Sequence, residues 1–141
     1  MLINNAGVIS NVGRQADIPV EEYLRIMDVN MNGAWYTLKY GVKLIEESGN
    51  GGRVVNISSL AGLSGATYKA GASHYGTSKH GLCGLTKIMA LEYAPNKIRI
   101  NAVAPTVIET DMVRKFLSTA ADLEQAKAIV SDTNPLVGPG N

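Results

Sequence analysis

The segment Arg53-Val54-Val55-Asn56-Ile57-Ser58-Ser59 is the clearest indication of the fold of this chain. Its short run of apolar, mostly β-branched residues predicts a buried strand over Arg53–Ser58. Hydroxyl side chains follow at the point where the chain leaves that strand. Downstream, the pattern predicts a helix over His74–Tyr93 and another strand over Ile98–Val103. A strand, a long helix and a second strand in this order are typical of a parallel sheet.

The preceding part of the chain continues the same alternation. Leu2–Asn4 predicts the end of a strand, Gly7–Pro19 a loop, and Val20 to about Glu47 a helix. One further helix, or two short ones, is predicted over Thr110–Val130. We therefore expect an α/β fold, with a parallel sheet of about three strands, flanking helices and right-handed crossovers. The length of 141 residues allows at most one domain.

Both long helices carry apolar residues at helical spacing. The first has Leu24, Met27, Met31, Trp35, Leu38 and Val42, and the second has Leu82, Leu85, Ile88, Met89 and Leu91. Helices 20–47 and 74–93 are apolar enough to pair with copies of themselves, as well as to cover a sheet.

Bulk properties exclude several classes of partner. The net charge of +1 indicates no strong attraction to nucleic acid or to a membrane surface. A single cysteine, Cys83, rules out an internal disulfide framework and is expected to be a core residue. No apolar run reaches transmembrane length, and no metal-ligand pattern is present, so we expect a cytoplasmic protein without a metal site.

Tyr75 and Lys79 stand four residues apart in the run HYGTSKHG over residues 74–81. In a helix, the two side chains lie on one face, one turn apart. A free tyrosine titrates near pH ~10, and a neighbouring ammonium lowers that pKa by favouring the phenolate. Such a phenol can give a proton to a carbonyl oxygen or take one from an alcohol. The alternatives are a packing tyrosine and a solvated lysine.

The spacing alone is weak evidence, because Tyr93 and Lys97 repeat it across the helix-breaking Pro95. The position of the first pair is the stronger argument. Ligands of parallel sheets bind beyond the carboxyl ends of the strands, and polar pairs follow the predicted strands at Asn4-Asn5, Ser58-Ser59 and Pro105-Thr106.

Several motifs occur in an informative order. They are Asn4-Asn5-Ala6-Gly7, Asn30 within a helix, Ser58-Ser59, Tyr75 with Lys79, and a strand that runs into Pro105. Taken together, these motifs resemble the short-chain dehydrogenase/reductase family over almost the whole chain. The resemblance implies an NAD(P)-dependent oxidoreductase that acts on a small alcohol or ketone and forms homo-oligomers through helices 20–47 and 74–93.

The resemblance also implies roles for individual residues. Tyr75 is the expected acid/base, and Lys79 lowers its pKa and holds the nicotinamide ribose. Ser59 holds the substrate oxygen, with Ser58 as its rival for that role. Asn30 helps to hold a water in a proton relay, unless its amide only makes a local backbone bond.

Cofactor-binding residues are likewise implied by the resemblance. Asn5, Ala6 and Gly7 match the segment beside the adenine ribose, while Pro105, Ile108 and Thr110, with Tyr75 and Lys79, match the nicotinamide side. The cofactor is NAD or NADP, with NAD favoured. Thr106 replaces the usual glycine, which favours a carveol-dehydrogenase-like, mycofactocin-associated subgroup.

The family's Gly-x-x-x-Gly-x-Gly turn, which holds the cofactor's pyrophosphate, does not occur in this sequence. We therefore expect the chain to correspond to the middle and late part of such an enzyme. The resemblance then implies that residues 1–141 form a single, truncated domain, the catalytic half, with a partial Rossmann-like doubly wound parallel sheet. A second hypothesis follows: the chain is an inactive remnant that serves as an interaction or oligomerisation module. A serine hydrolase is a third, disfavoured by the lack of a Gly-x-Ser-x-Gly elbow.

Overall fold

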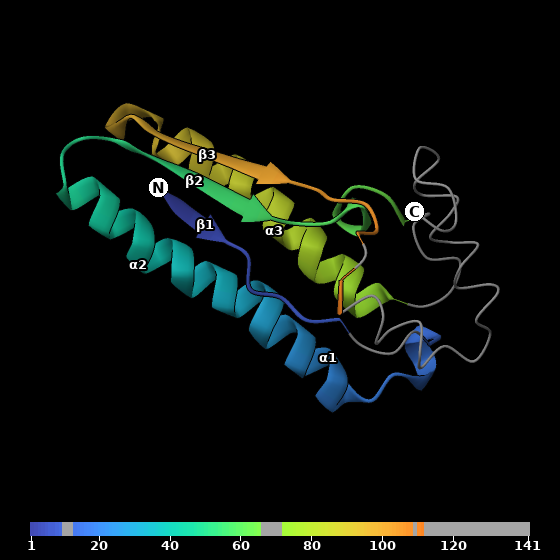
Figure 1. The fold of residues 1–141 in the computed structure, drawn as a ribbon. Helices are drawn as coiled ribbons and strands as arrows, with labels where there is room; N and C mark the ends of the chain where they lie inside the picture. The colour runs from blue at the N-terminus through green and yellow to red at the C-terminus, as the bar shows by residue number, and fades with distance from the viewer. Residues whose placement is uncertain (10–12, 66–71, 109, 112–141) are drawn as a thin grey trace.

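Three parallel strands form one sheet in the computed structural model, which describes residues 1–9, 13–65, 72–108 and 110–111. They are β1 (Leu2–Asn4), β2 (Gly52–Ile57) and β3 (Ile98–Val103), in the order β1-β2-β3 (Figure 1). The register pairs Asn4 of β1 with Asn56 of β2, and Asn56 with Ala102 of β3. All three strand predictions are confirmed to within a residue or two.

The first long helix is interrupted by a π turn. It consists of α1 (Val20–Met27), the π turn over Asp28–Asn32, and α2 (Gly33–Glu47). A π turn inserts an extra residue into the helical repeat, and such turns are frequent at functional sites. Residues 20–47 are thus helical throughout, as predicted, and the π turn at the centre is a feature that the spacing did not indicate.

The second long helix, α3 (Ser73–Glu92), leads from the end of β2 back to the start of β3. Short 3₁₀ turns occupy the connections: Gln15–Asp17, Leu60–Gly62 and Ala94–Asn96. The last of these ends at Lys97 in the left-handed conformation, with φ of 58°. Tyr93 and Lys97 are thus not aligned on one helix.

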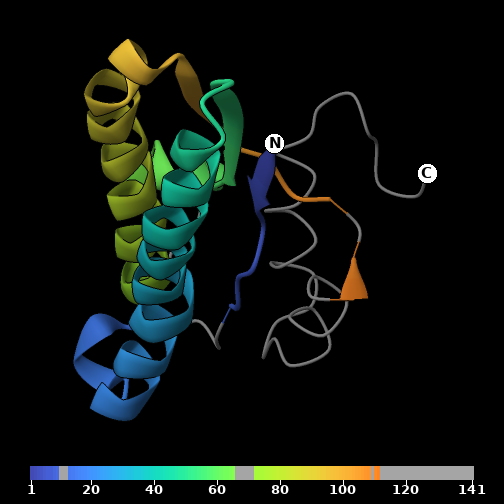
Figure 2. The same ribbon diagram turned by 90° about the vertical axis from the view of Figure 1, so that its left-hand side faces the viewer.

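α2 and α3 lie on the same face of the sheet, as Figure 2 shows. This arrangement follows from the strand order, because successive right-handed crossovers that advance in one direction place their helices on one side. The described strands and helices therefore form one wound half of a Rossmann-like sheet. A reversal of winding, which a doubly wound sheet requires, does not occur among the described elements.

The core lies between the sheet and this pair of helices. It is formed by Ala34, Leu38, Val42, Val54, Leu82, Met89, Ile98 and Ile100, and Cys83 is also buried. The buried residues of the first long helix recur every fourth position from Ile26 to Val42, and they include the polar Asn30.

Not every apolar residue at helical spacing faces the core. Leu24 is 53% exposed and Trp35 is 43% exposed, while Ile88 and Leu91 of α3 are exposed by 65% and 80%. The helical spacing therefore describes two apolar faces, of which only one packs on the sheet. The predicted helix over 110–130 lies outside the described residues, apart from Thr110 and Asp111.

Candidate active site

The carboxyl ends of the three strands meet at one edge of the sheet (Figure 1). Backbone hydrogen bonds extend the sheet beyond its strands there: Ser58 N–H donates to Val103 O at 2.8 Å, and Leu60 N–H donates to Pro105 O at 2.9 Å. The segment after β2 is therefore held beside the segment after β3. Polar side chains gather at this edge because parallel strands all end on the same side.

Tyr75 and Lys79 reach this edge from α3, which runs antiparallel to the strands and begins beside their ends. Both are buried, with exposed fractions of 8% and 4%. Lys79 Nζ donates to the backbone carbonyl of Ile57, the last residue of β2, at 3.0 Å. The same Nζ lies 5.7 Å from the centroid of the Tyr75 ring. The predicted pair is thus brought together and anchored to the end of the central strand.

Burial controls the ionisation of this pair. It raises the pKa of the Tyr75 phenol, and a hydrogen bond with the Ser59 side chain acts in the opposite direction. Burial also lowers the pKa of Lys79. The net shift at Tyr75 is opposite to the expected one, because removal of the phenolate from water outweighs the stabilisation of its charge.

The two serines after β2 have different environments. Ser58 is buried, and its hydroxyl donates to Lys79 O at 3.1 Å and lies 3.1 Å from the sulfur of Cys83. Ser59 is half-buried, accepts the Ala61 N–H at 3.2 Å, and shares a hydrogen bond with Tyr75. Ser58 therefore joins the end of β2 to α3 by a hydrogen bond, whereas the Ser59 side chain is directed toward the phenol of Tyr75.

Asn30 lies in the π turn and is 1% exposed. Its Oδ1 accepts the backbone N–H of Val8 at 2.8 Å, and its Nδ2 donates to the carbonyl of Val8 at 2.9 Å. The Asn30 amide therefore satisfies both backbone groups of Val8, in the way that a paired β-strand satisfies the backbone of its neighbour. These two bonds join residues that are 22 positions apart in the sequence. The alternative considered for Asn30, a bond from its amide to the nearby backbone, is therefore not what the structure shows.

Gly7 stands where this segment passes Lys79. A Cβ at Gly7 would lie 3.3 Å from Lys79 Nζ and 3.5 Å from Asn30 Oδ1. A Cβ at this position would require the ammonium to move by a few tenths of an ångström, so glycine allows the backbone to pass close to the lysine.

The remaining cofactor candidates lie at the same edge but differ in exposure. Asn5, Ala6, Ile108 and Thr110 are exposed, and Pro105 is half-buried. Their positions after β1 and β3 agree with the expectation, and contact with a cofactor stays a prediction.

One residue of the cluster was not singled out from the sequence. Ser78 is fully buried, accepts a hydrogen bond from Asn30 Nδ2 at 3.2 Å, and donates to the carbonyl of Tyr75 at 2.7 Å. The one indication in the sequence was a serine in the middle of a predicted helix, although alanine has the higher helix propensity.

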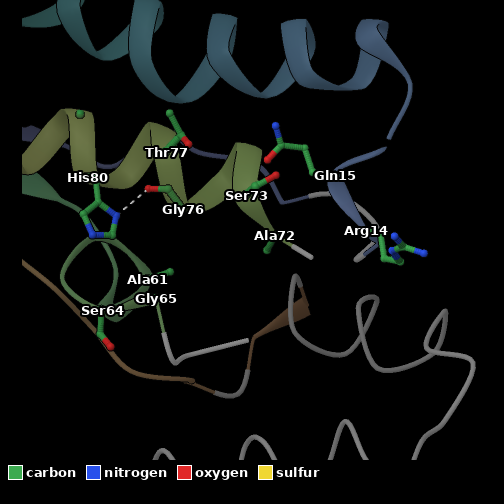
Figure 3. Close-up of a pocket in the computed structure, with 11 residues that line it drawn as sticks. Arg14, Gln15, Ala61, Ser64, Gly65, Ala72, Ser73, Gly76, Thr77 and His80 are labelled. Carbon is green, nitrogen blue, oxygen red and sulfur yellow. Dashed lines mark hydrogen bonds between the residues drawn. The ribbon is translucent and has the colours of Figure 1, made fainter. Parts of the chain in front are cut away.

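A separate hollow of about 830 Å³ opens beside the first turns of α3 (Figure 3). Ser73, Gly76, Thr77 and His80 line it from α3, and the His80 ring bonds to Gly76 O at 3.0 Å. Neither Tyr75 nor Lys79 lines this hollow, because they project from another face of the helix. It is therefore not part of the chemical cluster.

The described residues contain no group of three His, Cys, Asp or Glu side chains that could hold a metal ion. Within the same residues, no helix is both long and apolar enough to cross a membrane.

The class of protein to which this parallel sheet with its flanking helices belongs is shown by comparison with known proteins. The family model for short chain dehydrogenases matches residues 1–121. The chain belongs to the short-chain dehydrogenase family. This confirms the family predicted from the motifs.

Individual relatives show the extent of the match. Cyclohexanol dehydrogenase of Acinetobacter sp. (strain SE19) is 41% identical over 116 residues, which cover 82% of this chain and 45% of the relative. (−)-trans-Carveol dehydrogenase of Rhodococcus erythropolis is 40% identical over 110 residues, covering 78% and 39%. The matched part of the chain thus spans less than half the length of each of these two proteins.

Solved structures agree with the fold. Levodione reductase superposes with a TM-score of 0.81 at 31% identity, over 95% of this chain and 50% of that one. The structure of ElxO with NADP bound superposes with a TM-score of 0.74 at 28% identity, over 98% and 62%. The prediction of a Rossmann-like α/β fold is confirmed.

Proposed function

We propose that this chain carries the catalytic part of an NAD(P)-dependent oxidoreductase that interconverts a small alcohol and its ketone or aldehyde. The observation that supports it best is the packing of Tyr75, Lys79 and Ser59 at the end of β2, with a phenol beside both an ammonium and a hydroxyl. In this proposal Tyr75 moves the proton between its phenol oxygen and the substrate oxygen. Ser59 donates a hydrogen bond to that oxygen and orients it.

Lys79 has two tasks in this proposal. An ammonium has three N–H donors, and the Ile57 carbonyl takes one of them. The remaining donors suit the hydroxyls of a nicotinamide ribose. The positive charge 5.7 Å from the ring also favours the phenolate when Tyr75 gives up its proton.

The residues present fit the nicotinamide half of the cofactor. Gly7 brings the segment after β1 close to the ammonium of Lys79, since a Cβ there would lie 3.3 Å from Nζ, and we expect this segment and Lys79 to border the nicotinamide ribose together. Pro105, Ile108 and Thr110 would hold the carboxamide side, and Asn5 and Ala6 the adenine-ribose side. A bound NAD or NADP supplies or accepts the hydride, while the protein orients the reactants. NAD is the favoured cofactor, in accordance with the sequence analysis.

Asn30 is proposed to support a proton relay through a water near Lys79. Support comes from its burial in the π turn and from its bonds to Val8, which fix the segment beside the lysine. A cytoplasmic location, the carveol-dehydrogenase-like, mycofactocin-associated subgroup and the absence of nucleic-acid and membrane partners remain predictions.

A homo-oligomer formed through helices 20–47 and 74–93 is also proposed. Its support is the second apolar face of these helices, where large side chains are 43% to 80% exposed; they are Trp35, Tyr36, Tyr40, Leu44, Ile88 and Leu91. Exposed apolar patches of this kind mark surfaces for association.

The experiment that tests the function has two parts. NADH or NADPH is titrated into the chain while its fluorescence is followed, and NAD⁺ with cyclohexanol or carveol is then tested for turnover. Tyr75→Phe should bind nucleotide and lose roughly 10²–10⁴-fold in turnover, since only the proton transfer is removed. Tyr93→Phe, which changes a tyrosine outside the cluster, should retain turnover.

Two results would favour the other hypotheses. A folded chain that binds neither nucleotide would support the interaction module without activity. Activity that survives Tyr75→Phe but needs Ser58 or Ser59 would support a hydrolase, although the buried Ser58 hydroxyl is already bonded to α3.

A further inference from the structure

Ser78 is fully buried on α3, between the two residues to which the proposed function assigns the chemistry. Its hydroxyl donates to the Tyr75 carbonyl at 2.7 Å and accepts from Asn30 Nδ2 at 3.2 Å. A serine hydroxyl has one hydrogen to donate, and here the donated bond stays within α3 while the accepted bond leaves it. Ser78 thus connects the helical turn of Tyr75 with the π turn between α1 and α2.

The connection continues to the segment after β1. An asparagine amide has two donor hydrogens, and those of Asn30 are taken by Ser78 Oγ and by the carbonyl of Val8, at 3.2 Å and 2.9 Å. Oδ1 of the same amide accepts the Val8 N–H at 2.8 Å. Ser78 therefore fixes the orientation in which Asn30 holds both backbone groups of Val8.

Serine has no advantage for the helix itself at this position. Its helix propensity is lower than that of alanine, because the hydroxyl competes for backbone carbonyls. Alanine could make neither bond of the Ser78 hydroxyl, and of the two only the bond from Asn30 connects α3 with another helix. Removal of the hydroxyl would leave a buried Asn30 N–H without its acceptor.

We propose that Ser78 is a positioning residue, whose buried hydroxyl fixes the turn carrying Tyr75 and Lys79 relative to the segment after β1. This rests on the proposed function, which gives that turn its chemical task. A change at Val8 would also affect Lys79, because Gly7 directly precedes Val8 and lies close to the ammonium. A Cβ at Gly7 would be 3.3 Å from Lys79 Nζ. A shift of this segment would change the surroundings of the ammonium.

The test uses the full chain and needs no turnover. Ser78→Ala removes both bonds, and Ser78→Cys keeps nearly the same volume but replaces the hydroxyl with a weak donor and acceptor. Thr77→Ala, at the exposed neighbouring position, is the matched control. The readouts are amide hydrogen exchange at Val8 and NMR titration of the Tyr75 phenol, assigned with Tyr75→Phe.

Both Ser78 variants should exchange the Val8 amide on the order of tenfold faster, because Asn30 loses its fixed orientation. The titration midpoint of Tyr75 should fall toward its ordinary value as water reaches the phenol. Thr77→Ala should change neither readout. If Ser78→Ala does not fold, the near-isosteric Ser78→Cys decides by the same two measurements.

The proposal is overturned if exchange at Val8 and the Tyr75 midpoint both stay as in the wild type. It is also overturned if exchange quickens evenly along α3 with no change at Tyr75, since Ser78 would then only stabilise the helix. A wild-type chain that binds neither NADH nor NADPH counts against the proposed function alone, because the Ser78 readouts do not depend on nucleotide.

Discussion

The side-chain amide of Asn4 donates a 3.2 Å hydrogen bond to Oδ1 of Asn56, which joins β1 to β2 through their side chains. Asn56 in turn donates to Oγ1 of Thr86 at 2.9 Å, and Thr86 donates to Leu82 O at 2.7 Å. All three polar residues are buried. The chain of bonds fixes α3, and with it Tyr75, against the central strand.

Replacement of Thr86 with valine tests this connection. The substitution keeps the shape of the side chain but leaves the buried Asn56 N–H without its acceptor, so the free energy of unfolding should fall by about 1–3 kcal/mol. Urea denaturation followed by circular dichroism measures the change. Thr37→Val is the control, because Thr37 also bonds to the carbonyl four residues before it, at 2.9 Å to Gly33 O, but is exposed. Equal effects of the two substitutions would contradict a specific role for the buried chain.

Gly62 is the point at which the turn after β2 touches α3. A Cβ there would lie 2.6 Å from Ser58 Oγ and 2.7 Å from the carbonyl oxygen of Lys79. Backbone cannot yield as a flexible side chain does, so Gly62→Ala should destabilise the fold by about 1–3 kcal/mol. The Gly62→Ala substitution should also displace Lys79. A titration with NADH or NADPH would then show weaker binding of the nucleotide.

Gly65→Ala provides the comparison for this substitution. Gly65 is exposed, and a Cβ there would meet nothing within 4 Å. Its replacement should change the free energy of unfolding by less than about 0.5 kcal/mol. A Gly62→Ala variant as stable as Gly65→Ala would show that the close approach is not required.

Gly84 lies in the middle of α3, and a Cβ there would also meet nothing within 4 Å. Alanine has the better helix propensity, so Gly84→Ala should stabilise the chain by about 0.5–1 kcal/mol. Gly81→Ala, on the same helix, should gain less because its Cβ would lie 2.9 Å from the sulfur of Met31. Thermal unfolding of both variants measures which substitution stabilises the chain more. A Gly84→Ala variant less stable than the wild type would contradict the prediction.

We expect His74 to make the free energy of unfolding dependent on pH. Burial lowers its pKa in the folded chain, with the charges of Glu22 and Arg25 on α1 acting in opposite directions. The unfolded imidazole titrates near pH ~6.5, so the unfolded state binds the proton more readily. The contribution of the neutral, buried His74 to the free energy of unfolding is therefore fully present above about pH 6.5. It is lost as the pH falls below that value and through the pKa of His74 in the folded chain.

The measurement is the free energy of unfolding from pH 8 down to pH 5 in the wild type and in His74→Gln. The wild type should lose more stability than the variant over the acid part of this range. His80→Gln, at an exposed position, is the control for loss of an imidazole as such. Parallel curves for wild type and His74→Gln would refute the assignment to this residue.

The sequence by itself determined the elements and their order. The β-branched run at 53–58 and the apolar run at 98–103 predicted strands because alternation and composition are local properties. The order of strand and helix then implied a parallel sheet, and polar residues after each strand implied a site at one edge. Tyr75 and Lys79 were singled out by their four-residue spacing on a helix that starts beside this edge, and Ser59 was favoured over Ser58 by the resemblance to the short-chain dehydrogenase/reductase family.

Only the tertiary structure decided which neighbours each side chain has. Ser58 and Ser59 are equivalent in sequence, yet one bonds to α3 and the other to Tyr75. Asn30 reaches Val8 through a π turn that periodicity could not predict, and Ser78 acquires its partner from another helix. The direction of the Tyr75 pKa also depends on burial. These features depend on contacts between residues far apart in the chain, and local sequence does not say which residues make those contacts.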